Sequence, residues 1–181
     1  MAGFIEHDKI AEMAGIPNRI SNEINRFIDD IDPPKEFEEH NTERKIFVCG
    51  HLSVSIRSLS GPVKSENSPL HNRGKKEWIQ KEDLKWLLAT RKEYIKAYYL
   101  HFAVDNINDN KGRMKDTGET INQCINRWGK NAPIVPGTEP YLKDVLDFLR
   151  NNSEIIRQII FPDTDIGKLK DKEGTVYFGQ D

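Results

Sequence analysis

The chain has 181 residues, of which 36% are hydrophobic and 31% are charged, and its formal net charge at pH 7 is −2. A chain of this length is most simply one domain. The near-neutral charge argues against a surface that binds nucleic acid or an anionic membrane over its whole extent. Two cysteines are too few for a disulfide framework, and no run of 18 apolar residues occurs. We therefore expect a cytoplasmic protein that does not span a membrane.

Two short helices are predicted within residues 1–31, which we interpret as an N-terminal helical hairpin. The first covers residues 8–15 and ends at Gly15, because glycine readily takes the left-handed conformation that terminates helices. The second covers residues 17–30 and begins at Pro17, since proline is accepted in the first turn of a helix. We expect the apolar side of this hairpin to pack on the rest of the chain or on a second subunit.

Residues 10–16, IAEMAGI, have a small Ala in the helix, a Gly in the turn and an apolar residue after it. This segment resembles the first helix and turn of a helix-turn-helix DNA-binding motif. The resemblance implies a DNA-binding regulator whose second helix would contact DNA through Arg19 and Asn22. Acidic side chains outnumber basic ones by six to three in residues 1–31, so electrostatics favours packing of the hairpin over DNA binding.

Residues 44–59 have an apolar pattern compatible with a helix or with a strand, and we favour a helix because no nearby segment offers a strand to pair with. Six residues separate Arg44 from His51, a spacing similar to the R-x4-6-H motif of HEPN-type ribonucleases. The resemblance implies an all-α, dimeric, metal-independent ribonuclease of a defence or toxin system. In it His51 would act on the ribose 2′-hydroxyl and Arg44 would hold the phosphate. Residues 60–74 are predicted to be a loop.

One long helix is predicted at about residues 75–108, and we expect the other helices to pack around it. The segment has no Gly and no Pro in 34 residues, and its apolar side chains recur three or four positions apart. This spacing lines one face of an α-helix. An unbroken helix of this length would be about 50 Å long, at 1.5 Å per residue.

Basic and aromatic side chains occur together along this predicted helix. Residues 73–96 hold eight basic side chains against four acidic ones. Because bases stack on aromatic rings and phosphates pair with lysines, the pattern predicts binding of RNA or DNA, or of another acidic partner. The alternative is that the aromatic rings belong to the core and the lysines are only solvated. The residues concerned are Lys81, Lys85, Lys92, Lys96, Trp78, Trp86 and Tyr99.

His101 and Asp105 are separated by one helical turn, so their side chains can meet. A carboxylate could orient the imidazole for proton transfer or for a metal ion, and both residues are catalytic candidates. Zinc requires at least three protein ligands. Cys49 and His51 would complete a site only if the fold brought them close, so we predict no metal and no cofactor.

Further helices are predicted at residues 117–128 and 138–161, the second with a kink at residues 151–153. We therefore predict a single-domain, all-α bundle of five to six helices around the helix at about 75–108. It comprises a hairpin at residues 1–31, a bundle core at residues 35–161 and a polar tail at residues 162–181. The leading functional prediction is a small intracellular interaction protein that binds RNA, DNA or another acidic partner through its basic aromatic helix, with a homodimer as a further expectation.

Overall fold

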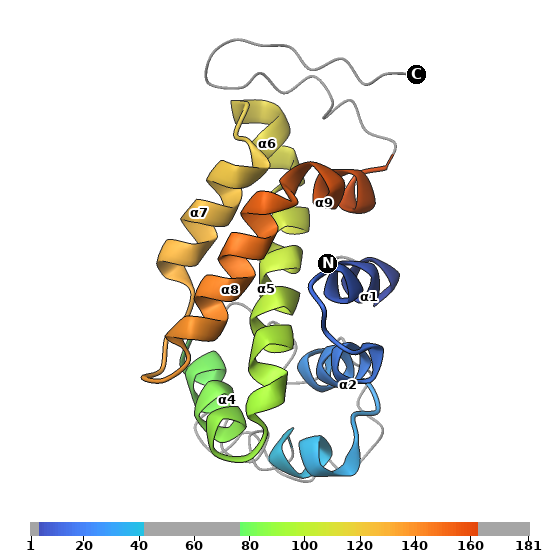
Figure 1. The fold of residues 1–181 in the computed structure, drawn as a ribbon, viewed down its shortest axis with the longest axis vertical. Coiled ribbons are helices and arrows are strands. Elements are labelled where there is room, and N and C mark those ends of the chain that lie inside the picture. Colours follow the sequence, from blue (N-terminus) through green and yellow to red (C-terminus); the bar gives the residue numbers. More distant parts are fainter. Residues whose placement is uncertain (1–3, 42–76, 163–181) are drawn as a thin grey trace, which may run out of the picture.

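Helices are the only regular elements in the part of the chain that the computed structural model describes, residues 4–41 and 77–162 (Figure 1). The predicted all-α fold is confirmed there, although with more helices than the five or six expected. None of the helices in these two ranges is both long and apolar enough to cross a membrane. The predicted helix at residues 44–59, the loop at 60–74 and the tail beyond Pro162 lie outside the described residues.

The N-terminal hairpin consists of α1 (Phe4–Met13) and α2 (Asn18–Asp29), joined by a turn at Gly15. Gly15 has a φ of 71°, a left-handed conformation that glycine adopts without steric cost. The apolar side of α2 is buried against the middle of the bundle. Ile31 follows the apolar stripe of α2 in the sequence, but its side chain is 41% exposed. The left-handed backbone of Asp30 ends α2 before this residue, so Ile31 does not continue its buried face.

The prediction of a single helix at about residues 75–108 is wrong, because the chain forms two separate helices there. α4 (Glu77–Thr90) ends before Arg91, a short 3₁₀ turn follows at Lys92–Tyr94, and α5 (Ile95–Asp109) comes next. Arg91 has a φ of −149° and a ψ of 56°, which lie outside the helical region. Figure 1 shows that α4 and α5 do not share an axis.

The break occurs at a charged residue that an unbroken helix would bury. In a continuous helix, position 91 would share a face with Leu87 and Tyr94, which are three or four residues away. These two side chains are 0% and 1% exposed. A guanidinium between them would lose its hydration. The irregular backbone instead leaves Arg91 partly exposed, where it pairs with Glu36.

α5 is the centre of the fold. It lies between α1 and α2 on one side and α7 (Ile121–Asn131) and α8 (Glu139–Asn151) on the other (Figure 1). Ten of its fifteen residues are buried, far more than the single apolar stripe of a surface helix, and polar His101 is among them. One apolar cluster runs from α1 through α5 to the last helix, so the described helices share a core.

A capping box begins α7, and irregular backbone at Asn152 separates the last two described helices. α6 (Lys111–Thr117) leads to α7, where Thr120 and Gln123 form a capping box in which each side chain bonds the other residue's backbone N–H. At Asn152 the backbone leaves the helical region, with a φ of −119° and a ψ of 18°. The kink predicted at this point is therefore a complete break, after which α9 (Ser153–Ile160) begins.

Candidate metal centre

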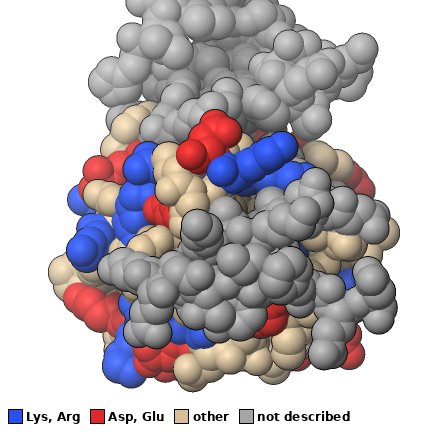
Figure 2. All heavy atoms as spheres, turned by 90° about the horizontal axis from the view of Figure 1, so that it is seen from above, with Lys and Arg blue, Asp and Glu red and all other residues tan. Residues whose placement is uncertain are grey.

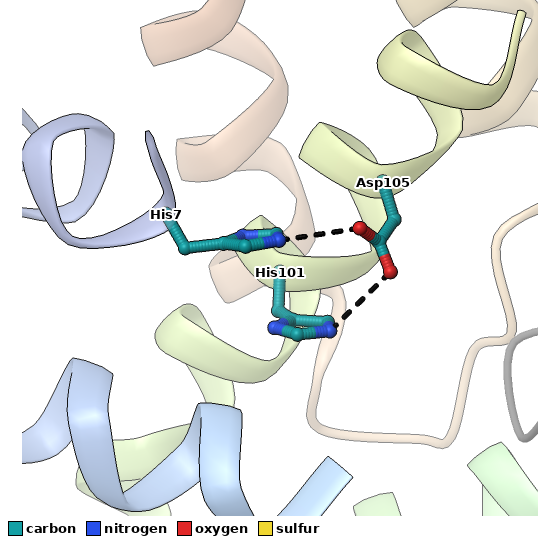
Figure 3. Close-up of side chains that lie close together, drawn as sticks. All are labelled: His7, His101 and Asp105. Atoms are coloured by element: carbon teal, nitrogen blue, oxygen red, sulfur yellow. Dashed lines mark hydrogen bonds and ion pairs between the residues drawn. The ribbon is translucent and has the colours of Figure 1, made fainter. Parts of the chain in front are cut away.

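Two histidines and one aspartate meet where α1 lies against α5 (Figure 3). His101 and Asp105 are one turn apart on α5, and His7 reaches them from α1. Asp105 contacts both rings: its Oδ1 is 3.2 Å from His7 Nε2, and its Oδ2 is 3.4 Å from His101 Nε2. The structure thus brings the predicted pair together and adds His7, which sequence reasoning missed.

The cluster is nearly closed to solvent. His7 and His101 are 3% and 2% exposed, and their rings stack with centroids 4.2 Å apart and an angle of 7° between the planes. The side chains of Asp105 and Asp29 are 18% and 11% exposed, and Asp29 Oδ1 is 3.9 Å from His101 Nε2. Asp29 is the last residue of α2. Three helices therefore contribute to the cluster, and solvent reaches it from the carboxylate side.

Only one of the two ring nitrogens of His101 has a hydrogen-bond partner. Nδ1 is 2.9 Å from Asn25 Oδ1, and an amide oxygen can only accept, so Nδ1 carries a proton. Nε2 has no hydrogen-bond partner and is the only such buried side-chain atom among residues 4–41 and 77–162. In the neutral ring, Nε2 presents a lone pair toward the carboxylate oxygens of Asp105 and Asp29. Such acceptors repel one another, and a cation between them removes the repulsion.

Burial and neighbouring charge set the protonation of the cluster. Burial is the main cause that lowers the pKa of His7; repulsion from the His101 ring adds to it whenever that ring is protonated, and the hydrogen bond to Asp105 only partly opposes these effects. Burial alone would raise the pKa of Asp105, but its contacts with His101 and His7 outweigh burial and lower it. Near neutral pH the cluster holds a neutral His7 and an ionised Asp105, which are the forms that bind metal ions.

The donor atoms fit a divalent transition-metal ion. One ligand atom from each of His7, His101 and Asp105 lies within 4.8 Å of the others. Imidazole nitrogens together with a carboxylate oxygen are the ligands of many zinc and non-haem iron sites. No third ligand lies near His101 in the sequence, and the fold supplies one in His7. Ligation requires the His7 ring to rotate out of its stack on His101 until both Nε2 atoms point at one centre, and the Asp29 carboxylate lies near the same nitrogen of His101.

The predicted nucleic-acid-binding residues do not share one continuous helix, because that helix is broken. Lys81 and Lys85 lie on α4, where each pairs with a glutamate at 2.6 Å. α4 holds only these two lysines against three acidic residues. Trp78 is 42% exposed, but Tyr99 is 1% exposed and donates its hydroxyl to a backbone carbonyl. Lys96 lies on α5 and donates to a backbone carbonyl next to α1 at 2.8 Å.

The other predicted nucleic-acid contacts are spread over several elements. Lys92 lies on the 3₁₀ turn, and Trp86 stacks on His40 with ring centroids 4.3 Å apart. Arg19 and Asn22 are exposed near the start of α2, where Arg19 bonds a glutamate one turn further on. On the described part of the face seen in Figure 2, basic and acidic side chains are interspersed, so that face shows no broad cationic patch. Nucleic-acid binding stays a prediction.

Arg44 and His51, the predicted ribonuclease pair, lie outside the described residues, and ribonuclease activity likewise stays a prediction. The candidate metal centre rests on the geometry of its own residues. Comparisons of the chain with protein-family models, with curated proteins and with solved structures gave no match.

Proposed function

We propose that the protein binds one divalent transition-metal ion, of the Zn²⁺ class, through His7, His101 and Asp105. The observation that carries the proposal is the buried Nε2 of His101, which faces carboxylate oxygens without a hydrogen bond. Nearly all buried polar atoms in folded proteins are satisfied, and a metal ion at this point satisfies this one. The same ion would take its second nitrogen from His7.

The competing explanation is a polar contact that only packs α1 against α5. Elsewhere in the fold a buried histidine makes such a contact: His40 Nε2 is 3.1 Å from Asp83 Oδ1, and Tyr98 donates to Asp83 Oδ2 at 2.9 Å. No buried side-chain atom of that group is left without a partner. The cluster at His101 differs because one ring nitrogen is left over. The pair of His40 and Asp83 therefore makes a matched control.

A metal ion in this position would join the N-terminal hairpin to the central helix. His7 and Asp105 are 98 positions apart in the chain, so an ion that bridges them stabilises the folded state. At a free metal concentration 100 times the dissociation constant, this stabilisation is about 2.7 kcal/mol. With Asp29 as a fourth ligand the site would be closed, as structural zinc sites are. The proposed role of the ion is to hold α1 and α2 on α5.

Titration of the metal-free protein with Co²⁺ and Zn²⁺ tests the proposal. The visible absorption of bound Co²⁺ reports its ligands, and calorimetry measures the stoichiometry. We expect one ion per chain, loss of binding in His7→Ala and His101→Ala, and retention of binding in the control His40→Gln. The proposal fails if the parent protein binds neither ion, or if His101→Ala binds as tightly as the parent.

A further inference from the structure

A second group of buried polar side chains contacts the Nδ1 side of the His101 ring. Asn25 and Ser21, both on α2, are each 2% exposed. The Ser21 hydroxyl donates to Asp8 Oδ1 at 2.7 Å, and Asn25 Nδ2 lies 3.3 Å from the same oxygen. Asn25 Nδ2 is also 3.5 Å from Ser21 Oγ, while Asn25 Oδ1 faces His101 Nδ1 at 2.9 Å. A chain of hydrogen bonds therefore runs from Asp8 on α1, through Asn25, to His101 on α5.

The carboxylate of Asp8 determines which way the Asn25 amide points. A carboxylate accepts hydrogen bonds, so the amide presents its NH₂ group to Asp8 and its oxygen to His101. Turning the amide over would place two oxygens in contact at a buried position, which is costly. The amide oxygen in turn accepts only from a protonated Nδ1. The orientation of one side chain thus selects the tautomer of the next.

We propose that Asn25, oriented by Asp8, is the positioning residue that keeps the proton of the neutral His101 ring on Nδ1 and leaves Nε2 for the metal ion. The consequence for metal binding rests on the proposed function, whereas the tautomer is a property of the metal-free protein. Histidine ligands generally donate their other ring N–H to a fixed acceptor, and loss of that acceptor weakens metal binding by about 10- to 100-fold.

The tautomer is measured by ¹⁵N NMR of the His101 ring in the metal-free full chain, at a pH at which the ring is neutral. The parent protein should carry its ring proton on Nδ1. Asp8→Lys replaces an acceptor by a group that only donates, so the Asn25 amide should turn over and the ring proton should move to Nε2. The double variant Asp8→Lys with Asn25→Asp restores an acceptor that faces both neighbours, and it should restore the Nδ1 tautomer.

The same variants are then titrated with Zn²⁺. Affinity should fall by about 10- to 100-fold in Asp8→Lys and recover in the double variant. A purely structural role of Asn25 predicts no such recovery of both tautomer and affinity. Asp8 is only partly buried, which favours folding of the variants. A proton on Nε2 in the parent protein, or an unchanged tautomer in Asp8→Lys, would overturn the inference. An Nδ1 tautomer in a parent protein that binds no Zn²⁺ would overturn only the proposed function.

Discussion

Acidification should destabilise the metal-free protein through His7. In the unfolded chain this histidine takes up a proton near its ordinary pKa of 6.5, whereas burial in the folded protein lowers its pKa. Between these two pKa values the unfolded state holds a proton that the folded state does not. The free energy of unfolding therefore decreases as the pH falls through 6.5, and this decrease ends below the pKa of the folded state.

The decrease in the free energy of unfolding corresponds to the one proton that His7 takes up in the unfolded chain. For a folded His7 that stays neutral, the free energy of unfolding decreases by about 1.4 kcal/mol between pH 7.5 and pH 5.5. Because His7 is 3% exposed and stacked on His101, solvent does little to stabilise a charge on its ring. The decrease of about 1.4 kcal/mol is an upper limit, because uptake of a proton by folded His7 between these two pH values would make the decrease in the free energy of unfolding smaller.

Urea unfolding of the full chain, followed by circular dichroism in the presence of a chelator, measures this pH dependence. The comparison is His7→Gln, whose amide can still donate to Asp105 but does not titrate. We expect the parent protein to lose more stability than the variant between pH 7.5 and pH 5.5, by up to about 1.4 kcal/mol. Parallel pH profiles for the two proteins would refute a lowered pKa for His7.

Two substitutions test the buried contacts in the same urea assay. Tyr98→Phe removes a hydroxyl that donates to the fully buried Asp83, and the free energy of unfolding should decrease by about 1.5–3 kcal/mol; an unchanged midpoint would mean that this bond contributes nothing. Leu149→Ala leaves a cavity at a side chain that is 0% exposed and should lower the free energy of unfolding by about 2–5 kcal/mol. The control Ile155→Ala, at a position that is 49% exposed, should change it by less than about 0.5 kcal/mol, and equal effects of the two would contradict the assigned core.

Local periodicity was sufficient to predict the all-α fold. Ile20, Ile24 and Phe27 recur three or four positions apart, and all three are buried on one face of α2. This pattern depends only on neighbours within a turn or two, so it can be recognised without knowing what the helix packs against. The separation of α8 from α9 at Asn152 was also indicated locally, by a cluster of short polar residues between two apolar stretches.

The break at Arg91 could not be predicted in this way. The segment contains no Gly or Pro, and its apolar spacing continues across the break. The chain departs from the helix because Leu87 and Tyr94 become buried, and their burial depends on other helices that pack on them. Tyr99 illustrates the same point. On an isolated helix the Tyr99 ring would be exposed to solvent. In the fold it is buried, because helices cover α5 on both sides.

The candidate metal centre could likewise be predicted only in part from the sequence. The contact of His101 with Asp105 follows from helix geometry, because the two residues are one turn apart. His7 lies 98 positions from Asp105, and Asn25 comes from a third helix, so no spacing rule relates them to the pair. The amino-acid sequence by itself determined that these segments are helical and where most of their apolar faces lie, since both depend on near neighbours. Only the tertiary structure decided which polar side chains meet between α1, α2 and α5, since that depends on the packing of distant segments.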